Sequence, residues 1–416
     1  MKKTIKYLSI FFLIIFVKNS YALTLEDSIN LALKSNQEIK LYEHRLYDSK
    51  FENYHALAEF LPKIFINIQN GKRINKNDNF NEKINFTSRE ISFDQAIFNG
   101  FSSILNLKKS DKIYLIELAN LKERKQNLAS EVAKIYSNIF WQRKNLENYR
   151  KIYDLTKKIL EIKSQKLSVK IIDKEEFIRD QIELENLNQK IANEELDLIK
   201  NYNDFIALVG VGFEKINEFK IIEIPIKKSE ILLKINQNFL LQSKYLKYQL
   251  SLDNVALKTS EFLPKVSIIA NISKQKNNIY SANNQINNRS VMLNFSIPIF
   301  QNGHEYIDYN ASKNQSKIAL DEYEIYKNYL TLEISKICDE LESTLQNLKI
   351  SQNMLGFLEE KKQILQSKYN AKIIDLIELY NAEISLEFQK IANNKLQNIL
   401  NYFHYKILGL IGEINV

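Results

Sequence analysis

The sequence has few of the residues that interrupt helices. Its 416 residues include only 8 Gly and 4 Pro. The stretch 101–209 contains neither, and the stretch 304–408 contains only Gly356. Gly and Pro break helices, and each stretch is several times longer than an average globular helix. We therefore expect each stretch to fold back on itself as a hairpin of two long helices.

Cysteine and long apolar runs are also scarce. The single Cys338 excludes an internal disulfide. After the first 22 residues, no apolar run approaches the roughly 18 residues that a membrane-spanning helix needs. If the chain enters a membrane, it must therefore do so through β-strands.

The residue patterns of catalytic, metal and nucleotide sites are missing as well. The four histidines are scattered, with no Cys or carboxylate at metal-ligand spacing. There is no Gly-rich phosphate loop and no Gly-x-Ser-x-Gly motif. The net charge of +8 is spread along the chain without a basic stripe. The sequence therefore predicts no enzyme activity, no cofactor, no metal and no nucleic-acid partner.

Residues 1–22 have the pattern of a secretory signal peptide. Lys2, Lys3 and Lys6 form a basic start. Residues 7–17 are an apolar run too short for a stable anchor, and small residues precede a cleavage site after Ala22. The alternative is an uncleaved anchor. We expect an exported protein that begins near residue 23.

Apolar residues repeat every seven positions in both long stretches. The repeat runs through Leu128, Val132, Ile135, Ile139, Leu146, Tyr149, Tyr153 and Leu160, and again through Leu330, Ile334, Ile337, Leu341, Leu348, Leu355 and Leu358. Such a repeat keeps facing a partner helix only if the helices coil around each other. Apolar residues such as Trp141 and Ile152 lie off this seam. We therefore expect a cylinder of helices, with an ordinary two-stranded coiled coil as the alternative.

The chain contains a large internal duplication. Residues 60–63 (Phe-Leu-Pro-Lys) recur at 262–265, and residues 170–173 (Lys-Ile-Ile-Asp) recur at 372–375, both at an offset of 202 residues. One register held over more than a hundred positions indicates duplication of a large unit. The expected parts are a signal peptide at 1–22, a first repeat at 23–212 with strands at about 63–98 and a hairpin at 101–209, a connection at 213–228, and a second repeat at 229–416 with strands at about 265–300 and a hairpin at 304–408.

Each repeat holds two candidate strands joined by a polar, Asn-rich loop, which includes residues 75–81 in the first repeat and Tyr280, Asn283 and Asn287 in the second. Alternation is clearest at Val266, Ile268, Ala270 and Ile272, and at Val291, Leu293, Phe295, Ile297 and Ile299. A period of two gives one apolar face and one mostly polar face. Four strands are too few to close a barrel, and an open sheet edge is not tolerated in lipid. Several copies of the chain would therefore have to close a water-filled barrel together; the alternative is a small soluble sheet packed on the helices.

An exported chain with this duplicated arrangement resembles the TolC family of outer-membrane efflux proteins. The resemblance is carried by residues 25–32 (Leu-Glu-Asp-Ser-Ile-Asn-Leu-Ala), the Leu-Pro pairs at 61–62 and 263–264, residues 295–300 (Phe-Ser-Ile-Pro-Ile-Phe) with Gly303, and residues 408–412 (Leu-Gly-Leu-Ile-Gly). It implies a mainly α fold with a membrane β-barrel part. Two tandem repeats of short helices, two strands and a long coiled-coil helical hairpin would trimerise, giving a twelve-stranded barrel and a twelve-helix periplasmic tunnel.

The resemblance also implies a function without chemistry. A homotrimer in the outer membrane, in contact with outer-membrane lipid, would be the exit duct of a tripartite efflux or type I secretion system. Its partners would be a periplasmic adaptor (membrane fusion) protein and an inner-membrane ABC or proton-driven transporter. The alternative is a periplasmic coiled-coil adaptor or scaffold without a channel, although an adaptor would have one hairpin rather than two.

Candidate functional residues lie at the turns of the hairpins. In the family, an acidic pair one helical turn apart lines the periplasmic entrance, and Asp375 and Glu378 match that pair. The nearest matches to the family's closing links are Asp173, Tyr369 and Lys372. Three chains would set six carboxylates around one opening, which would attract cations and raise some of the carboxyl pKa values.

A plainer interpretation fits the same acids. Asp375 with Glu378, and Asp173 with Glu176, each have the spacing of a capping box for the returning helix. The turns at 168–170 and 370–372 are also shorter than the family's and lack its usual Gly.

Overall fold

The computed structural model describes residues 23–77, 80–212, 227–279, 282–300 and 302–414, and of these residues 75–77, 80–83, 277–279 and 282–284 by their backbone alone. The predicted signal peptide and most of the predicted connection lie outside the described residues. Within them, no helix is both long and apolar enough to cross a membrane.

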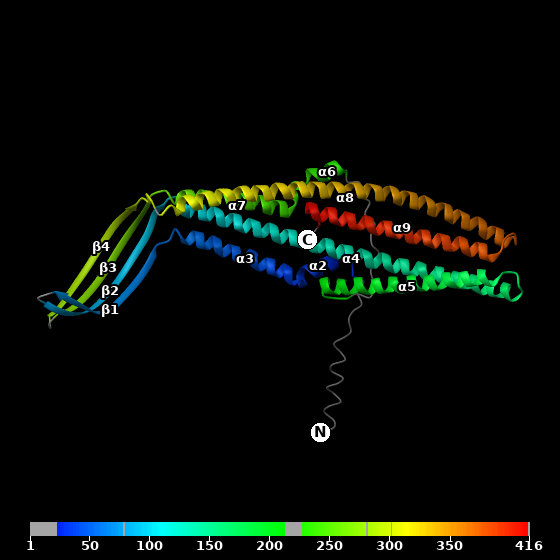
Figure 1. The fold of residues 1–416 in the computed structure, drawn as a ribbon, viewed down its shortest axis with the longest axis horizontal. Helices are drawn as coiled ribbons and strands as arrows, with labels where there is room; N and C mark the ends of the chain where they lie inside the picture. The colour runs from blue at the N-terminus through cyan, green and yellow to red at the C-terminus, as the bar shows by residue number, and fades with distance from the viewer. Residues whose placement is uncertain (1–22, 78–79, 213–226, 280–281, 301, 415–416) are drawn as a thin grey trace, which may run out of the picture. The chain divides into compact units, whose positions relative to one another are not determined.

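Long helices dominate the chain (Figure 1). The elements are α2 (Leu25–Ser35), α3 (Gln37–Ala58), β1 (Lys63–Asn77), β2 (Phe80–Asn99), α4 (Ser102–Ser168), α5 (Lys174–Val209), α6 (Lys228–Leu233), η1 (Ile235–Gln237), α7 (Phe239–Ser260), β3 (Lys265–Ile279), β4 (Ala282–Ser296), α8 (His304–Asn370) and α9 (Leu376–Ile411). Helices α4 and α8 both have 67 residues, and α5 and α9 both have 36. The mainly helical fold with two strand pairs is confirmed.

The chain forms two compact units, and each unit draws on both sequence repeats. Unit 1 comprises the described residues within Met1–Lys40, Lys122–Asn238 and Leu330–Val416. Unit 2 comprises Leu41–Leu121 and Phe239–Tyr329.

Unit 1 is built around the heptad seam. The predicted seam is buried from Leu128 to Tyr149 and from Leu330 to Leu348. Trp141, which lies off the seam, is buried as well, so the helices have neighbours on a second side. In Figure 1, α5 runs beside the end of α4, and α9 runs beside the end of α8.

A row of amide and hydroxyl contacts joins α4 to α9 within unit 1. The Asn398 amide donates to the side-chain oxygen of Asn138 (2.9 Å), and the Ser137 hydroxyl donates to Asn398 (2.7 Å). Near the end of the chain, the Gln126 side chain donates to the Ile414 carbonyl (2.8 Å) and accepts from the Ile414 backbone N–H (3.0 Å). Buried polar side chains are costly unless paired, so these contacts favour a single register between the two helices.

Unit 2 contains one antiparallel sheet in the order β1-β2-β3-β4. Strand β2 of the first repeat pairs with β3 of the second, with a bulge between Ala96 and Phe98. The residues expected to form a polar loop instead continue the strands, since Asn283 and Asn287 pair with β3. Strand β4 ends at Ser296, although the alternation continues to Ile299, because Pro298 has no N–H for a ladder.

The sheet has one apolar face and one mostly polar face. Paired residues share a face, and the apolar one carries Ile64, Ile66, Ile68, Ile91, Phe93, Val266, Ile268, Ala270, Ile272, Val291, Leu293 and Phe295. We call it the apolar face and the opposite one the polar face. The apolar face is open in the single chain, since Val291 is 77% and Leu293 69% exposed.

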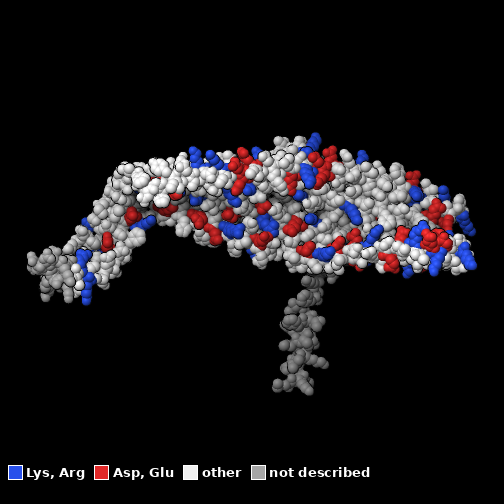
Figure 2. All heavy atoms as spheres, viewed as in Figure 1, with Lys and Arg blue, Asp and Glu red and all other residues white. Residues whose placement is uncertain are grey.

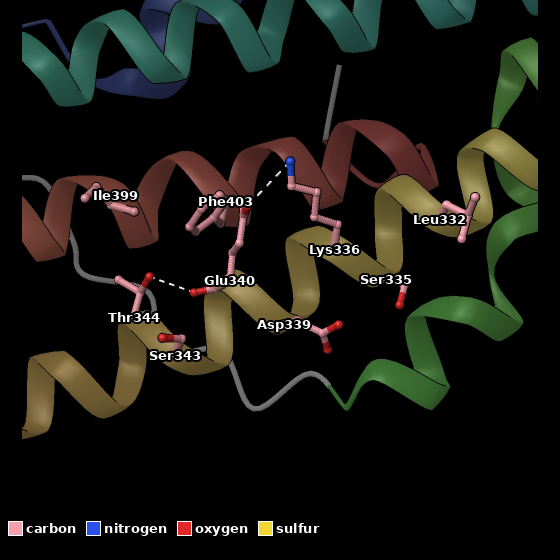
Figure 3. Close-up of a pocket in the computed structure, with 9 residues that line it drawn as sticks. All are labelled: Leu332, Ser335, Lys336, Asp339, Glu340, Ser343, Thr344, Ile399 and Phe403. Atoms are coloured by element: carbon pink, nitrogen blue, oxygen red, sulfur yellow. Dashed lines mark hydrogen bonds and ion pairs between the residues drawn. The ribbon is translucent and has the colours of Figure 1, made fainter.

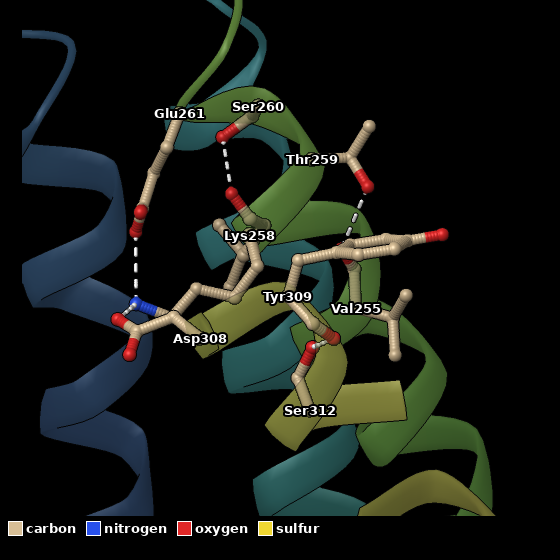
Figure 4. Close-up of polar contacts among 9 residues, drawn as sticks. Val255, Lys258, Thr259, Ser260, Glu261, Asp308, Tyr309 and Ser312 are labelled. Atoms are coloured by element: carbon tan, nitrogen blue, oxygen red, sulfur yellow. Dashed lines mark hydrogen bonds and ion pairs between the residues drawn. The ribbon is translucent and has the colours of Figure 1, made fainter. Parts of the chain in front are cut away.

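The strands pass into the long helices through turns with positive φ. Gly100 has φ +69°, and a Cβ on it would lie 2.5 Å from the Ser260 carbonyl oxygen. At the same end of unit 2, Lys258 of α7 contacts Glu261 and Asp308, each at 2.9 Å (Figure 4). These contacts hold the end of α7 to the start of α8.

Substitution of two glycines should have opposite effects on stability. Gly100→Ala should destabilise the fold by more than about 2 kcal/mol, because the backbone at residue 260 must move and the left-handed conformation is strained. Gly356→Ala, within α8 and with no atom near the new Cβ, should stabilise it by up to about 1 kcal/mol. Denaturant unfolding of both variants measures the difference. Equal effects would contradict this account of the strand-to-helix turn.

Candidate functional site

Both long hairpins turn through the same tight backbone motif. After α4, Lys170 has φ +61°, and the N–H of Ile171 reaches back to the Lys166 carbonyl (2.9 Å). After α8, Lys372 has φ +57°, and Ile373 bonds the Lys368 carbonyl (2.9 Å) in the same way. This is a Schellman motif with Lys at the left-handed position that Gly usually fills. The missing Gly is therefore replaced by a lysine under backbone strain of about 1 kcal/mol.

The two capping boxes that the sequence predicts do not behave alike. Asp173 precedes α5, and its carboxylate accepts from the Glu176 backbone N–H at 2.7 Å. Asp375 occupies the same position before α9, but its side chain makes no capping hydrogen bond. The capping bond to the third helical residue is therefore present at Asp173 and absent at Asp375, where the backbone N–H groups of Leu376 and Ile377 still help to lower the pKa of the carboxyl.

The Asp375 carboxylate is instead paired with Lys166, at the end of α4. This contact links the tip of the second hairpin to the end of the first helix of the other repeat. The side chains are 51% and 31% exposed, so water screens the pair. The Lys166 ammonium lowers the pKa of Asp375 below its ordinary value of 3.8. In the single chain this effect is opposite in direction to the rise expected from clustered carboxylates.

The other candidate residues lie around the same turn. Glu378 is exposed on the first turn of α9 and, within the described part of the chain, its carboxylate forms no ion pair. Tyr369 is half-buried against the apolar cluster of the second hairpin, which includes Leu365 and Leu379. Lys372 is exposed. No hydrogen bond or ion pair among the described residues joins Asp173 to either Tyr369 or Lys372.

Two lysines that contact these turns were not identified from the sequence. Lys166 contacts Asp375 across 209 positions of sequence, and no local pattern marks it. Lys163 lies one turn earlier on α4 and pairs with Glu176 (2.9 Å) and Asp180 (2.6 Å) of α5. Lys163 could have been predicted from the sequence, because Lys163 and the two acids lie on opposite sides of the turn between α4 and α5. Two antiparallel helices bring such positions together.

An open groove runs along α8 elsewhere in unit 1 (Figure 3). Its lining is Leu332, Ser335, Lys336, Asp339, Glu340, Ser343, Thr344, Ile399 and Phe403. Its acids are paired, since Asp339 contacts Lys228 of α6 (2.7 Å) and Glu340 lies 3.8 Å from Lys336. Among the described residues, no group of three or more His, Cys, Asp or Glu could hold a metal ion. We assign the groove no ligand.

The arrangement of two strand pairs joined into one sheet, each followed by a long helical hairpin, is similar to the fold of solved outer-membrane channels. The chain is similar to the outer membrane channel CmeC of Campylobacter jejuni, at 16% identity and a TM-score of 0.78, over 94% of this chain and 85% of that one. It is also similar to the outer membrane protein VceC of Vibrio cholerae, at 12% identity and a TM-score of 0.79, over 93% and 96% of the two chains.

A third similar structure is the open state of the MtrE outer membrane channel of Neisseria gonorrhoeae, at 13% identity and a TM-score of 0.73, over 93% of this chain and 88% of that one. No protein-family model and no curated protein matches the sequence. The resemblance to the TolC family is therefore confirmed at the level of the fold.

The contact between Lys166 and Asp375 should be weak and should depend on pH. A double-mutant cycle with Lys166→Ala and Asp375→Ala should give a coupling energy of about 0.2–1 kcal/mol at neutral pH, because both groups are partly exposed. Since the folded-state pKa of Asp375 is lowered, this stability is present above its ordinary value of 3.8 and is lost as the pH falls through the lower folded-state value. Unfolding measured from neutral to strongly acidic pH tests both statements.

A matched cycle between Lys163 and Asp180, which joins α4 and α5 of one hairpin, serves as the control for a contact within a repeat. A Lys166–Asp375 coupling that is zero at neutral pH, or that persists when Asp375 is fully protonated, would contradict the assignment.

Proposed function

We propose that this protein is an outer-membrane channel, the exit duct of a tripartite efflux or type I secretion system. The observation that carries the proposal is the sheet with two open edges, found in a chain with the fold of outer-membrane channels. Strands β1 and β4 each pair on one side only within the described residues. An exposed strand edge next to an exposed apolar face favours pairing of that edge with a strand of another chain.

Closure by copies of the same chain suits the strand directions. Neighbouring strands alternate in direction from β1 to β4, so β4 of one copy can pair antiparallel with β1 of the next. A homotrimer would then form a twelve-stranded barrel with its apolar face toward lipid and its polar face toward water. The helices also expose large apolar side chains, including Leu332 (71%) and Phe357 (70%) on α8. These side chains support burial against further copies.

The proposed partners follow from this role. Substrate would arrive from an inner-membrane ABC or proton-driven transporter through a periplasmic adaptor protein, and outer-membrane lipid would surround the barrel. C. jejuni CmeC and N. gonorrhoeae MtrE are themselves outer membrane channels, which supports the outer membrane as the location. Export would use residues 1–22 as a signal peptide. The adaptor or scaffold alternative is not favoured, because the similar structures are channels.

We place the periplasmic entrance at the hairpin turns. Glu378 has no ion-pair partner in the described chain, whereas Lys166 offsets the charge of Asp375. In the trimer, Glu378 would therefore supply most of the negative field at the opening. Asp173, Tyr369 and Lys372 would provide closing links between neighbouring copies, because among the described residues of the single chain Asp173 contacts neither Tyr369 nor Lys372.

Chemical crosslinking of the sheet edges should yield a closed ring of three chains. In a Cys338→Ser background, Asn67→Cys on β1 would be combined in turn with cysteines at Asn288, Ser290, Met292 and Asn294 on β4, all on the polar face. At least one pairing should give dimer and trimer bands and none larger. The single-Cys parents are the controls, and their products should stop at two chains. No trimer at any pairing would refute closure through these edges.

The assembled protein should conduct ions in a planar bilayer and should prefer cations. Glu378→Ala should move the reversal potential in a salt gradient toward zero more than Asp375→Ala does, because Lys166 already offsets Asp375. Glu359→Ala with Glu360→Ala removes two exposed acids of α8 away from the turn and is the matched control. If the cation preference were unchanged after Asp375→Ala with Glu378→Ala, the proposed role of these acids at the entrance would be wrong. No conductance at all would overturn the proposed function.

A further inference from the structure

On the apolar face of the sheet, the positively charged side chains that the structure describes lie together in one part. Arg89 pairs directly with Lys274 across β2 and β3, and Arg289 pairs with Ile272, which places all three on the apolar face. Lys72 and Lys276 lie on the same face, paired with Asn85 and Thr87. We call these five residues the cationic belt. On the side of the molecule that Figure 2 shows, charged side chains are sparser over the sheet than over the helices.

The acidic side chains of the sheet lie on the other face. Among the side chains that the structure describes in the strands, the acids are Glu90 and Asp94, and both pair with β1 residues of the polar face. Lys63, Arg73 and Lys265 also lie there. The polar face therefore mixes both signs of charge, whereas the described part of the apolar face carries only positive charge.

The cationic belt lies directly beyond the apolar rows, toward the strand tips. Along β3, the apolar run from Val266 to Ile272 is followed at the next same-face positions by Lys274 and Lys276. Along β4, Arg289 immediately precedes the run that starts at Val291. All five belt residues are exposed, and none of them forms an ion pair with another described residue. The side chains are therefore available to an external anion.

We infer that the cationic belt binds the phosphate groups of lipid headgroups where the membrane surface meets the apolar face. This inference rests on the proposed function, which puts the apolar rows in hydrocarbon. Unpaired cations are unfavourable within hydrocarbon and favourable at an anionic headgroup layer. Arg89 and Arg289 present planar guanidinium groups that bind phosphate bidentately, and the lysines add point charges. A lipid with several phosphate groups, whose acyl chains cover the adjacent apolar rows, fits the surface better than a free anion.

Native mass spectrometry of the full, detergent-purified protein tests this inference. The probe is diphosphoryl lipid A, compared with phosphatidylcholine and with inorganic phosphate. The wild type should bind diphosphoryl lipid A in preference to phosphatidylcholine. Arg89→Gln, Lys274→Gln and Arg289→Gln together should weaken that binding about tenfold or more, because each cation near an anionic lipid surface contributes about a fivefold effect.

The polar face supplies a control with the same loss of charge. Lys63→Gln, Arg73→Gln and Lys265→Gln together should leave the lipid preference unchanged, and Arg89→Lys with Arg289→Lys should keep most of it. Loss of preference in both triple variants would show a response to net charge alone and would overturn the inference. The inference would also be overturned if the apolar-face triple variant kept the wild-type lipid preference. Displacement of the lipid by inorganic phosphate at matched phosphate concentration would overturn it as well.

Conductance of the same samples in a phosphatidylcholine bilayer distinguishes a failure of the lipid-binding inference from a failure of the proposed channel function. A wild type that conducts but shows no lipid preference overturns the cationic belt and leaves the channel standing. A wild type that neither inserts nor conducts overturns the proposed function and the belt with it.

Discussion

Unsatisfied backbone groups at the two edges of the sheet are the constraint on which the other features depend. Strands β1 and β4 each have a second side without a partner in the described chain, and the face beside them is apolar and open. Neither hydrocarbon nor water suits this surface, because hydrocarbon cannot solvate the edge and water is a poor solvent for the face. Pairing with further copies, as proposed above, would satisfy both the edges and the apolar face, and the long helices would then provide a second contact surface between copies.

Helix packing in unit 1 is fixed by polar as well as apolar contacts. A heptad seam alone tolerates sliding by whole heptads, because each apolar layer resembles the next. The amide pairs between α4 and α9, such as Asn138 with Asn398, disfavour such sliding, since a shifted register would leave partly buried amides unpaired. The two bonds between Gln126 and the backbone of Ile414 fix the end of the chain against α4 in the same way.

Much of the fold could be predicted from the sequence because its signals are local or periodic. The scarcity of Gly and Pro marked the long helices, and the heptads marked buried positions from Leu128 to Tyr149. The extent of the strands was harder to predict, because Asn283 and Asn287 have turn-forming side chains yet lie in a regular antiparallel ladder.

The candidate site was predictable only in part. Asp173 forms the capping bond that its spacing indicates, while Asp375 has the same spacing and does not. The difference arises from Lys166, whose proximity depends on how the two hairpins pack and on no neighbouring residue of Asp375. Likewise, the Schellman turns use Lys170 and Lys372 where sequence rules favour Gly, so the sequence alone did not indicate the left-handed positions.

The even number of strands per chain has a consequence for subunit counting. With four strands in each chain, β4 of one copy is always antiparallel to β1 of the next. Hydrogen bonding between copies would therefore be satisfied equally in rings of any number of copies. A chain with three or five strands would reject odd rings by parity alone. In the proposed assembly, the number of subunits would therefore be set by how helices of neighbouring copies pack, and mutations that change that number should fall on the helices and not on the strands.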